Sequence, residues 1–590
     1  MSTIFRILIN LKDLFNLLSR KTKKKCLLHI ILLILVALVE FSYTSSLIPL
    51  SEALSQNISS MDNSLITNKN IIQFAFLFGF LALISGFGRS FIIWRNGFIA
   101  SQLSSEISSA ALLNDFKKST NYFYKYEESQ FTSDYSTQLQ NLCCFIIRPI
   151  FDLFSACCQV LILFFLLFSY APLLSSTAFI CIGISYFICI LIAKPRLSKN
   201  SKKIKDEVSK TVSLLISIYR LQREIRIFNV IKRNTKNFNS FANSYLNAIA
   251  SNTFFASFPR FTIETIGTVF LVFYILIFII IFPQNLDKII PQISLFILCA
   301  SKILPSTQQI YASISSISGF KETIFLFNSK SINNTSKSFS AKKINNIENL
   351  GDEFSLMHLE NIRCMIPGLK TNLITDFNLK LPSSGLVSIV GKSGCGKSTL
   401  LDLLMGIEHP EKGNIFLKRN NEIILNQFEF QQKYFKSFSY VSPSAYVVEG
   451  TVKKNILELS QKEISDKLIE NARYMSCCQD KDGIFLNDDA KKLSMGQKQR
   501  VAIARSLVQG RNILVLDEAL ASIDINNARK ILSRLSNNED PKLIIQISHR
   551  SNELEDSKLI LKISSERKLI TFKNDKDSSA FEKYISHLKN

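Results

Sequence analysis

The sequence predicts two fused domains: an all-α membrane domain with six transmembrane helices, followed by an α/β domain built around a P-loop. Two observations support this prediction. Six stretches in the first half of the 590 residues are mostly apolar and close to the ~20 residues that cross a bilayer. In the second half, an apolar strand pattern at 386–390 runs into the string GKSGCGKST and then into a helix pattern, which is the strand-loop-helix order of a P-loop.

The chain begins with a segment, residues 1–25, whose apolar residues recur at helical spacing between Ile4 and Leu18. The pattern predicts an amphipathic elbow helix that lies in the cytosolic interface of the membrane. A signal peptide is the alternative, but its basic residues would precede its apolar run. Here the basic cluster at 21–25 precedes the first span instead, so we expect that span to be retained.

The membrane domain is expected over residues 26–327. Long polar segments at 96–142 and 194–252 have helical patterns, and they predict helices that continue far into the cytosol. The other connections between spans are short. The six predicted spans are 27–50, 71–94, 145–168, 173–193, 262–282 and 289–311.

The distribution of charge predicts the orientation. Residues 1–25 carry seven Lys or Arg against one acidic residue, and residues 195–252 carry twelve against three. The short connections on the opposite side carry only Lys69 and Lys288 as basic residues. Because basic residues gather on the cytoplasmic side, we expect an integral protein of the cytoplasmic (inner) membrane with both termini in the cytoplasm.

The formal net charge of +23 could instead indicate a nucleic-acid partner. The basic residues, however, lie mainly beside the spans, where anionic lipid headgroups attract them. We therefore predict the lipid bilayer as a partner and no nucleic acid. The twelve cysteines show no C-x-x-C spacing, so packing in the interior is the simpler interpretation for them.

Ionisable residues inside the spans are costly, and this makes them candidates for function. Two i,i+4 pairs, Arg148 with Asp152 and Arg260 with Glu264, can each meet on one helix face. The alternative for such a pair is a purely structural ion pair. The full set is Glu40, Arg89, Arg148, Asp152, Arg260, Glu264 and Lys302.

Residues 328–350 are rich in Ser, Asn and Lys, which predicts a linker, and the α/β domain then covers 351–590. In a P-loop, backbone N–H groups of the glycine turn and of the helix start wrap phosphates. Lys397 would add its charge near the β and γ phosphates, and the Ser398 hydroxyl could reach Mg²⁺. The predicted phosphate-binding residues are Gly391, Lys392, Ser393, Gly394, Cys395, Gly396, Lys397, Ser398 and Thr399.

Three more strings follow in order: LSMGQKQR from Leu493, ILVLDEA from Ile513 and ISHR from Ile547. This ordered set, over roughly residues 352–572, resembles the ATP-binding cassette (ABC) family. With the six spans, the resemblance implies an exporter-type half-transporter whose second domain is an ABC ATPase. One P-loop per chain then implies a dimer of two half-transporters, homo- or heteromeric, that uses ATP and Mg²⁺.

The resemblance also implies roles for the matched residues. Asp517 would hold a water of the Mg²⁺ ion, Glu518 would orient or deprotonate the attacking water, and His549 would contact the γ-phosphate. In the family, the signature serine reaches ATP from the opposite cassette. The remaining nucleotide-binding candidates are Ser494, Gly496 and Gln497 of the signature and Asp524 of the D-loop.

Three positions depart from the family pattern. Met495 stands in the signature where glycine is usual. Pro443 falls where the Q-loop glutamine is expected, so that contact to Mg²⁺ and water is missing or is supplied by Ser442 or Ser444. Ile366 falls where an aromatic residue usually stacks on adenine, which predicts weaker stacking.

Two functions from different classes fit these motifs. The first is an ATP-driven exporter or flippase that moves an amphiphile, and the second is an ATP-gated membrane regulator or pore that hydrolyses ATP poorly. Pro443 and Ile366 favour the second, whereas Glu518, His549 and the signature favour the first more strongly. The six spans exclude a soluble DNA-repair ATPase, and an importer of this family would usually carry its ATPase on a separate chain.

Two short strings bear on the identity of the cargo. The strings at 259–264 and 302–306 resemble corresponding strings in exporters of lipid-linked saccharides, a far shorter resemblance than that of the cassette. It implies Arg260, Glu264 and Lys302 as substrate candidates. A basic inner wall would suit a pyrophosphate headgroup, and a lipid or a peptide remains the alternative.

Overall fold

The computed structural model describes residues 2–60, 65–116, 126–170, 172–281, 286–331, 357–365, 372–408, 410–419, 422–426, 435–460, 463–538, 540–548, 550–564 and 568–574. Two predicted site positions, Ile366 and His549, and most of the predicted linker lie outside these residues. The chain divides into a helical unit, with the described residues up to 331, and an α/β unit, with those from 357 onward. Each unit is described by itself.

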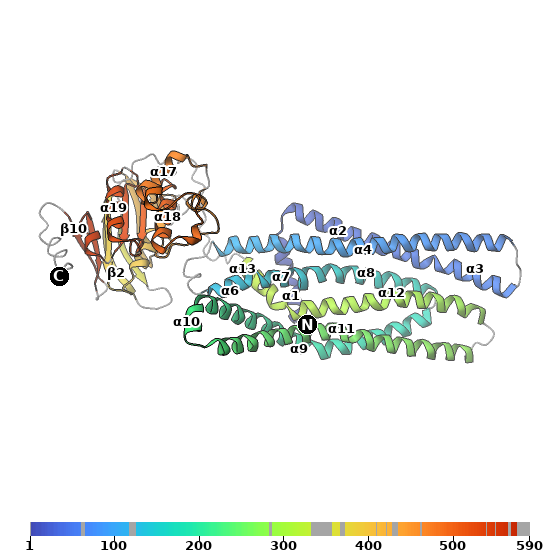
Figure 1. The fold of residues 1–590 in the computed structure, drawn as a ribbon. Coiled ribbons are helices and arrows are strands. Elements are labelled where there is room, and N and C mark those ends of the chain that lie inside the picture. Colours follow the sequence, from blue (N-terminus) through green and yellow to red (C-terminus); the bar gives the residue numbers. More distant parts are fainter. Residues whose placement is uncertain are drawn as a thin grey trace. The chain divides into compact units, whose positions relative to one another are not determined.

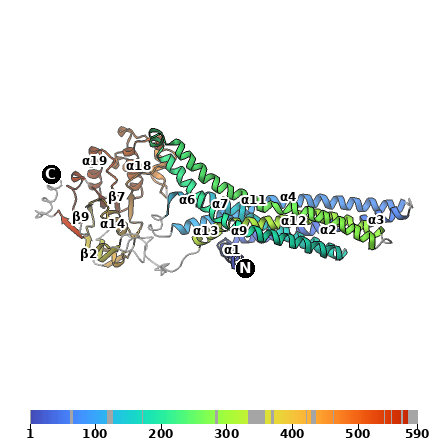
Figure 2. The ribbon, with the colours of Figure 1, turned by 90° about the horizontal axis from the view of Figure 1, so that it is seen from below.

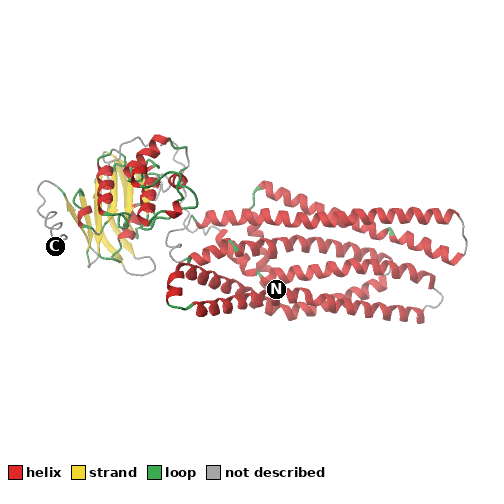
Figure 3. Cartoon of the chain, viewed as in Figure 1, coloured by secondary structure: helices red, strands yellow, loops and turns green. Residues whose placement is uncertain are grey.

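The described part of the helical unit is built from helices, several of them very long (Figure 1; Figure 3). In both views of the ribbon, α9, α11 and α12 run lengthwise beside one another (Figure 1; Figure 2), and α8 packs against α12 and α9. The bounds are α1 Ser2–Asn16, α2 Arg20–Ser45, α3 Leu47–Ser60, α4 Leu65–Asp115, α6 Glu128–Tyr135, α7 Thr137–Asn141, the π-helix η1 Leu142–Ile147, α8 Arg148–Tyr170, α9 Pro172–Arg220, α10 Gln222–Ile227, α11 Ile231–Ile281, α12 Leu286–Gly319 and α13 Lys321–Ser331.

The predicted elbow helix is α1, and it ends earlier than the sequence pattern indicated. A short break follows it, and α2 begins at Arg20, where the Ser19 hydroxyl accepts a hydrogen bond from the Thr22 N–H. The basic cluster 21–25 therefore belongs to the first turns of α2. Leu14 and Leu18 are buried in one core cluster with Phe327 of α13, so apolar packing within the unit holds this segment.

Four helical stretches of the described residues are long and apolar enough to cross a membrane: Arg20–Ala53, Ile71–Asp115, Glu128–Tyr170 and Ser175–Arg220. They contain the first three predicted spans and all of the fourth except its first two residues. The fifth and sixth predicted spans fall in α11 and α12, where many side chains lie outside the described set. Six spans remain a prediction with which these helices are consistent. The long polar segments are helical over much of their described length, since α4 continues to Asp115, α9 to Arg220, and α11 begins at Ile231.

The first predicted span is interrupted where α2 ends and α3 begins. Hydroxyl groups cluster there: Ser42 bonds back to the Leu38 carbonyl at 3.1 Å, and Ser46 bonds back to the Tyr43 carbonyl at 2.7 Å. Such hydroxyls compete with the helical ladder and often bend a helix. A hydropathy pattern does not indicate such a bend, because the residues around the serines are apolar.

The α/β unit contains two sheets (Figure 3). The smaller sheet is antiparallel, with the order β2-β1-β4-β5, and the larger has the order β10-β9-β3-β8-β7-β6, in which only the β10–β9 pair is antiparallel. The strands are β1 Met357–Met365, β2 Asn372–Leu381, β3 Gly385–Gly391, β4 Lys412–Arg419, β5 Glu422–Asn426, β6 Phe438–Val441, β7 Ile513–Asp517, β8 Leu543–Ile547, β9 Leu559–Ile563 and β10 Leu569–Lys573.

Helices accompany these strands, and the strand predicted before the P-loop, at 386–390, is confirmed as β3 to within one residue at each end. All five residues of β7 and of β8 are buried, as expected for parallel strands that are covered on both faces. The helices are α14 Lys397–Leu404, α16 Val452–Leu457, α17 Asp466–Met475, α18 Met495–Leu507 and α19 Ile525–Ser536, with short 3₁₀ turns η3 Asp480–Asp482, η4 Ala490–Lys492 and η5 Ser551–Glu553.

Candidate functional site

The P-loop lies between β3 and α14, as the sequence predicts. The ammonium group of Lys397 is buried in the loop and donates to the carbonyls of Gly391 at 3.1 Å and Lys392 at 3.3 Å. Gly394 and Gly396 have positive φ angles of 78° and 101°, a backbone region that favours glycine. The loop can therefore turn tightly and present its N–H groups and one cation to an anion, as phosphate binding requires.

Strand geometry brings the acidic candidates to the same place. Both β3 and β7 are parallel to β8, and Ile389 and Asp517 both pair with Ile547 across their ladders. The carboxyl ends of these strands therefore share one edge of the sheet, which is where open α/β folds bind ligands. Asp517 ends β7 at that edge and Glu518 follows it, and Ser548, the last described residue before His549, follows β8.

Asp517 has the environment of a metal-site ligand. Its carboxylate is buried; Oδ2 accepts a hydrogen bond from the Tyr440 hydroxyl at 3.1 Å, and Oδ1 has no hydrogen-bond partner among the described residues. A buried oxygen without a partner is expensive, and a hydrated Mg²⁺ ion would satisfy it. The donor set of Asp517 and the Ser398 hydroxyl, both hard oxygens, fits Mg²⁺.

The backbone of Glu518 is strained. Its φ is 47°, in the left-handed region that non-glycine residues seldom occupy, and its side chain is half-buried. Such strain is typical of functional positions, where it fixes the direction of a side chain. The sequence identified Glu518 by motif alone, whereas its backbone conformation is a second, independent mark.

Three carboxyl groups share the electrostatics of this edge. Burial raises the pKa of Asp517, and the adjacent Glu518 carboxylate raises it further, whereas the Tyr440 hydrogen bond and the charge of Lys397 oppose the shift. On α14, burial raises the pKa of Asp402 to about 6, with added repulsion from Glu408 and Asp517. Asp402 and Tyr440 were not identified from the sequence. The accumulated negative charge favours a divalent cation at this edge.

The signature residues start α18. Ser494 is exposed and caps the helix: its hydroxyl accepts from the Gln497 N–H at 3.3 Å, and its own N–H donates to Gln497 Oε1 at 2.9 Å. The backbone N–H and the side-chain oxygen of Gln497 therefore both form hydrogen bonds with Ser494. A Cβ atom at Gly496 would lie 2.9 Å from the Ser522 carbonyl, so only glycine allows the signature and the D-loop to pack this closely. Met495, by contrast, is 58% exposed.

The D-loop and the residue after His549 are joined. Asp524 caps α19 by accepting from the Asn527 N–H at 2.9 Å, and this hydrogen bond is the main cause that lowers the pKa of Asp524. Arg550 donates to the carbonyls of Ala521 at 2.8 Å and Ile523 at 3.1 Å. Arg550 was not identified from the sequence, although it belongs to the quoted ISHR string.

The Q-loop position is held by its backbone. Gln499 of α18 donates from Nε2 to the Ser442 carbonyl at 2.8 Å, and the Ser442 hydroxyl donates to the Ser444 carbonyl at 2.8 Å. Pro443 is exposed between them. Of the two serines that the sequence offered as substitutes for the missing glutamine, Ser442 thus has its proton engaged locally.

The ionisable residues of the spans differ in the contacts that they make. Arg89 forms an ion pair with Glu40 at 2.7 Å, and its Nη2 donates to Gln159 at 2.8 Å, which links three helices. The Arg148–Asp152 pair is confirmed at 3.8 Å. Lys302 is half-buried, with its Nζ 5.4 Å from the centre of the Tyr43 ring.

Arg260 and Glu264, whose i,i+4 spacing allows them to meet, do not form an ion pair in this structure. Both side chains are described and exposed. Instead, Glu264 lines a cavity of about 430 Å³ whose walls come from α8, α9, α11 and α12. The cavity is mostly apolar, and neither Arg260 nor Lys302 belongs to its lining, which includes Leu167, Phe179, Ile266, Gly267, Phe296 and Ala300.

Comparisons with known proteins agree with this architecture. Residues 27–301 match the family model of the ABC transporter transmembrane region, and residues 374–521 match that of the ABC transporter. An ATP-dependent lipid A-core flippase of Wigglesworthia glossinidia brevipalpis is 26% identical over 424 residues, which is 70% of each chain. A protein of Rickettsia bellii named as an export ATP-binding/permease protein is 34% identical over 200 residues, 33% of this chain and 34% of that one.

A solved structure has the same fold. A bacterial Atm1-family ABC exporter with ATP bound superposes with a TM-score of 0.74 at 16% identity, and the match covers 97% of this chain and 98% of that chain. The two family models together account for both units in the order that the motifs predicted. The chain belongs to the ABC transporter family and is an ATP-driven exporter in which a helical membrane domain is fused to an ABC ATPase domain.

Proposed function

We propose that the chain is one half of a dimeric exporter that moves an amphiphile across the cytoplasmic membrane, driven by Mg²⁺-ATP hydrolysis at sites shared between two cassettes. The observation that supports this best is the common sheet edge. There, Lys397 is buried in the loop that follows β3, Asp517 at the end of β7 has one carboxylate oxygen without a partner among the described residues, and Glu518 beside it has a strained backbone.

The residue roles follow from chemistry. Lys397 and the P-loop N–H groups would hold the phosphates, and Ser398 and Asp517 would bind Mg²⁺ and its waters, which neutralise charge on the transferred phosphoryl group. Glu518 would orient the attacking water and take its proton. His549, outside the described residues, is proposed from its place after β8 to contact the γ-phosphate.

The exposed signature supports a dimer. Ser494 faces solvent, and among the described residues no hydrogen bond or ion pair joins it to the P-loop of its own chain. A serine positioned by a capping box but with no phosphate site of its own can serve a second cassette. That cassette would belong to a second copy of this chain or to a different half-transporter.

The cargo is proposed to be an amphiphile whose apolar part enters the cavity beside Glu264. A mostly apolar cavity with a carboxyl group in its wall suits a molecule with a large apolar body and a polar end. The relative named as a lipid A-core flippase adds weight to a lipid-like cargo. By the excess of basic residues at 1–25 and 195–252, both termini and the ATPase would lie in the cytoplasm.

The first prediction tests the ATP site in the full-length protein, reconstituted in lipid nanodiscs. Glu518→Gln should leave nucleotide affinity unchanged and lower steady-state hydrolysis at least a hundredfold, because loss of a positioned base costs factors of about 10² to 10⁴. Lys397→Ala should weaken binding of a fluorescent ATP analogue instead. Unchanged turnover in Glu518→Gln would remove this residue from catalysis.

A second candidate function has one observation in its favour. At the Q-loop position, Pro443 offers no side-chain oxygen, and the hydroxyl of Ser442 is engaged with Ser444. An ATP-gated regulator that turns over slowly would tolerate this loss. Measured hydrolysis that amphiphiles do not stimulate, together with ATP-dependent conductance of the reconstituted protein, would favour that function over export.

A further inference from the structure

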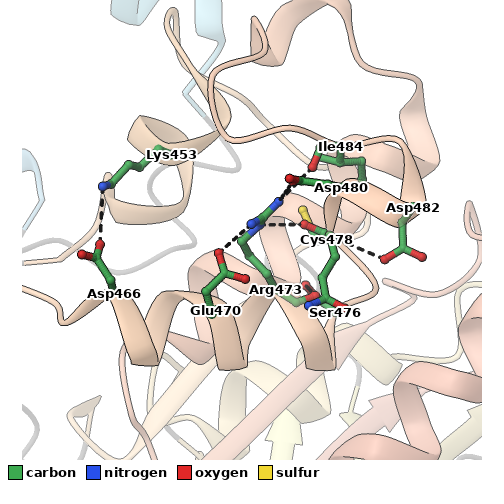
Figure 4. Close-up of polar contacts among 10 residues, drawn as sticks. Lys453, Asp466, Glu470, Arg473, Ser476, Cys478, Asp480, Asp482 and Ile484 are labelled. Carbon is green, nitrogen blue, oxygen red and sulfur yellow. Dashed lines mark hydrogen bonds and ion pairs between the residues drawn. The ribbon is translucent and has the colours of Figure 1, made fainter.

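One buried arginine of the α/β unit gathers a loop around its guanidinium group (Figure 4). Arg473, in the last turns of α17, is only 4% exposed. Its Nε donates to the Cys478 carbonyl at 2.9 Å, and its Nη2 donates to the Ile484 carbonyl at 3.0 Å. Glu470 accepts from Nη1 at 2.6 Å, and Asp480 accepts from Nη2. The guanidinium therefore bridges the two ends of the loop 478–484.

The backbone of this loop is shaped to turn its carbonyls inward. Cys477 has a φ of 51° and Gly483 a φ of 71°, so the chain reverses at both ends of the turn η3. Arg500 of α18 donates to the Cys477 carbonyl at 2.6 Å. Buried carbonyls need donors, and here two arginines from two helices supply them.

The loop is connected to the signature serine by one side chain. Gln497 donates from Nε2 to the Gly483 carbonyl at 3.3 Å, and its Oε1 accepts the N–H of Ser494 at 2.9 Å. A shift of Gly483 would therefore move Gln497 and, with it, the cap that sets the backbone direction of Ser494. Arg473 lies at the start of this series of contacts.

We propose that Arg473 is a positioning residue for ATP hydrolysis: it fixes the loop 478–484, and through Gln497 it sets the direction of Ser494. The inference rests on the proposed function, in which Ser494 meets the ATP of a second cassette. The planar fork of arginine can hold two carbonyls at once, whereas the single ammonium of lysine cannot span them. The role therefore depends on the shape of the side chain and not only on its charge.

Arg473→Lys tests this dependence because it keeps the charge. A displacement of about 1 Å in a catalytic arrangement can cost ~10² in rate, so we expect the hydrolysis rate per folded transporter to fall at least tenfold. The affinity of the P-loop for a fluorescent ATP analogue should stay within about twofold, since Lys397 is untouched. ATP-dependent closure of two cassettes, measured by cross-linking, should weaken in parallel with the rate.

The matched control is Arg534→Lys. Arg534 of α19 packs on α17 beside Arg473, with its guanidinium 4.0 Å from the centre of the Tyr474 ring, and its hydrogen bonds go to the Tyr474 carbonyl and the Cys477 sulfur, outside the loop 478–484. Its hydrolysis rate should remain within twofold of the parent. A purely structural role for Arg473 would instead lower the thermal midpoint and the ATP affinity of Arg473→Lys without lowering the rate per folded molecule, and that result would overturn the inference.

A double-mutant cycle with Gln497→Ala tests the route. If Arg473 acts through Gln497, the double variant loses no more rate than Gln497→Ala alone; additive losses would overturn the route. Ser494→Ala separates the two levels of the proposal. Full activity of Ser494→Ala would contradict the shared ATP site itself, whereas a slow Ser494→Ala beside a fully active Arg473→Lys would overturn only the role of Arg473.

Discussion

At the scale of single residues, Asp402 shows what the P-loop helix contributes beyond its motif. It lies on α14, and burial, followed by the carboxylates of Glu408 and Asp517, raises its pKa to about 6. The ordinary pKa of an aspartate is about 3.9. Between these two values the folded protein binds more protons than the unfolded chain does, so the contribution of Asp402 to stability falls as the pH rises from about 4 to 6.

Asp402→Asn should remove this dependence. We expect the variant to gain thermal stability over the parent above pH 6, where the buried carboxylate is ionised, and the gain to shrink toward pH 5. The thermal midpoint measured from pH 5 to 7.5 with chelator present checks it, because bound Mg²⁺ would mask the repulsion. Asp466→Asn, whose side chain is 91% exposed, controls for net charge. An offset for Asp402→Asn that does not change with pH would contradict the assignment.

Motifs identify residue types but not the surroundings that make them reactive. The sequence identified Asp517 and Glu518 by their motif. The structure adds three features: an oxygen of Asp517 without a partner among the described residues, the φ of 47° at Glu518, and the hydrogen bond that the Tyr440 hydroxyl donates to Asp517. Tyr440 precedes the Q-loop position by three residues, and nothing in its spacing indicates that it faces β7. Strand register, which is a long-range property, decides such neighbours.

At the scale of elements, the strands near the P-loop could be predicted because short apolar runs with clear ends are typical of buried parallel strands. β3, predicted at 386–390, is observed at Gly385–Gly391. Hydropathy could not predict the break after Ser45 or the start of α2 at Arg20. The break coincides with hydrogen bonds from serine hydroxyls to backbone carbonyls, and the start with a serine cap, and neither changes the hydropathy of the segment. Spacing along a helix also could not decide whether Arg260 and Glu264 form an ion pair, because i,i+4 spacing permits this contact without requiring it.

The end of the membrane domain offers a test at this scale. Lys330, in the last turn of α13, is 5% exposed and lies 3.1 Å from both Asp115 and Asp134, whose side chains are also buried. The Tyr126 and Tyr135 rings lie 4.7 and 4.3 Å from its Nζ. One ammonium group therefore holds three helices together, α4, α6 and α13, by neutralising buried acids.

Lys330→Met should destabilise the helical unit by about 3 to 5 kcal/mol, because the two carboxylates would remain buried without a cation. Thermal unfolding of the purified protein in detergent measures the change. Lys321→Met, in the first turn of the same helix and bonded to the Ser198 hydroxyl at 2.6 Å, is the matched control and should cost about 1 kcal/mol. Equal stability of the two variants would show that the acids are paired or protonated in another way.

At the scale of the whole molecule, the polarity of the cargo can be tested. The sequence-based proposal places an anionic headgroup beside Arg260 and Lys302. The described cavity, however, contains Glu264 and apolar side chains, and both basic residues lie outside its lining. On the proposed function, the apolar cavity would accept the body of the amphiphile, and Arg260 and Lys302 would form a separate site that selects its charge.

Two sets of variants separate these parts. Gly267 lines the cavity, and a Cβ atom there meets nothing within 4 Å, so Gly267→Phe would fill space without a clash at its Cβ. We expect this variant to lose stimulation of the ATPase by any amphiphile while the basal rate persists, because the cavity excludes the apolar body. Intact stimulation would place the cargo elsewhere.

The headgroup is tested in phosphatidylcholine vesicles to which phosphatidylglycerol or a quaternary-ammonium amphiphile is added. If the headgroup is anionic, neutralising Arg260 and Lys302 together should abolish the response to phosphatidylglycerol, since long-range attraction to both charges is lost. The Glu264→Gln variant should keep that response. The reverse pattern, in which Glu264→Gln alone loses a response to the quaternary-ammonium amphiphile, would overturn the anionic proposal, because a carboxylate in an apolar wall attracts a cation.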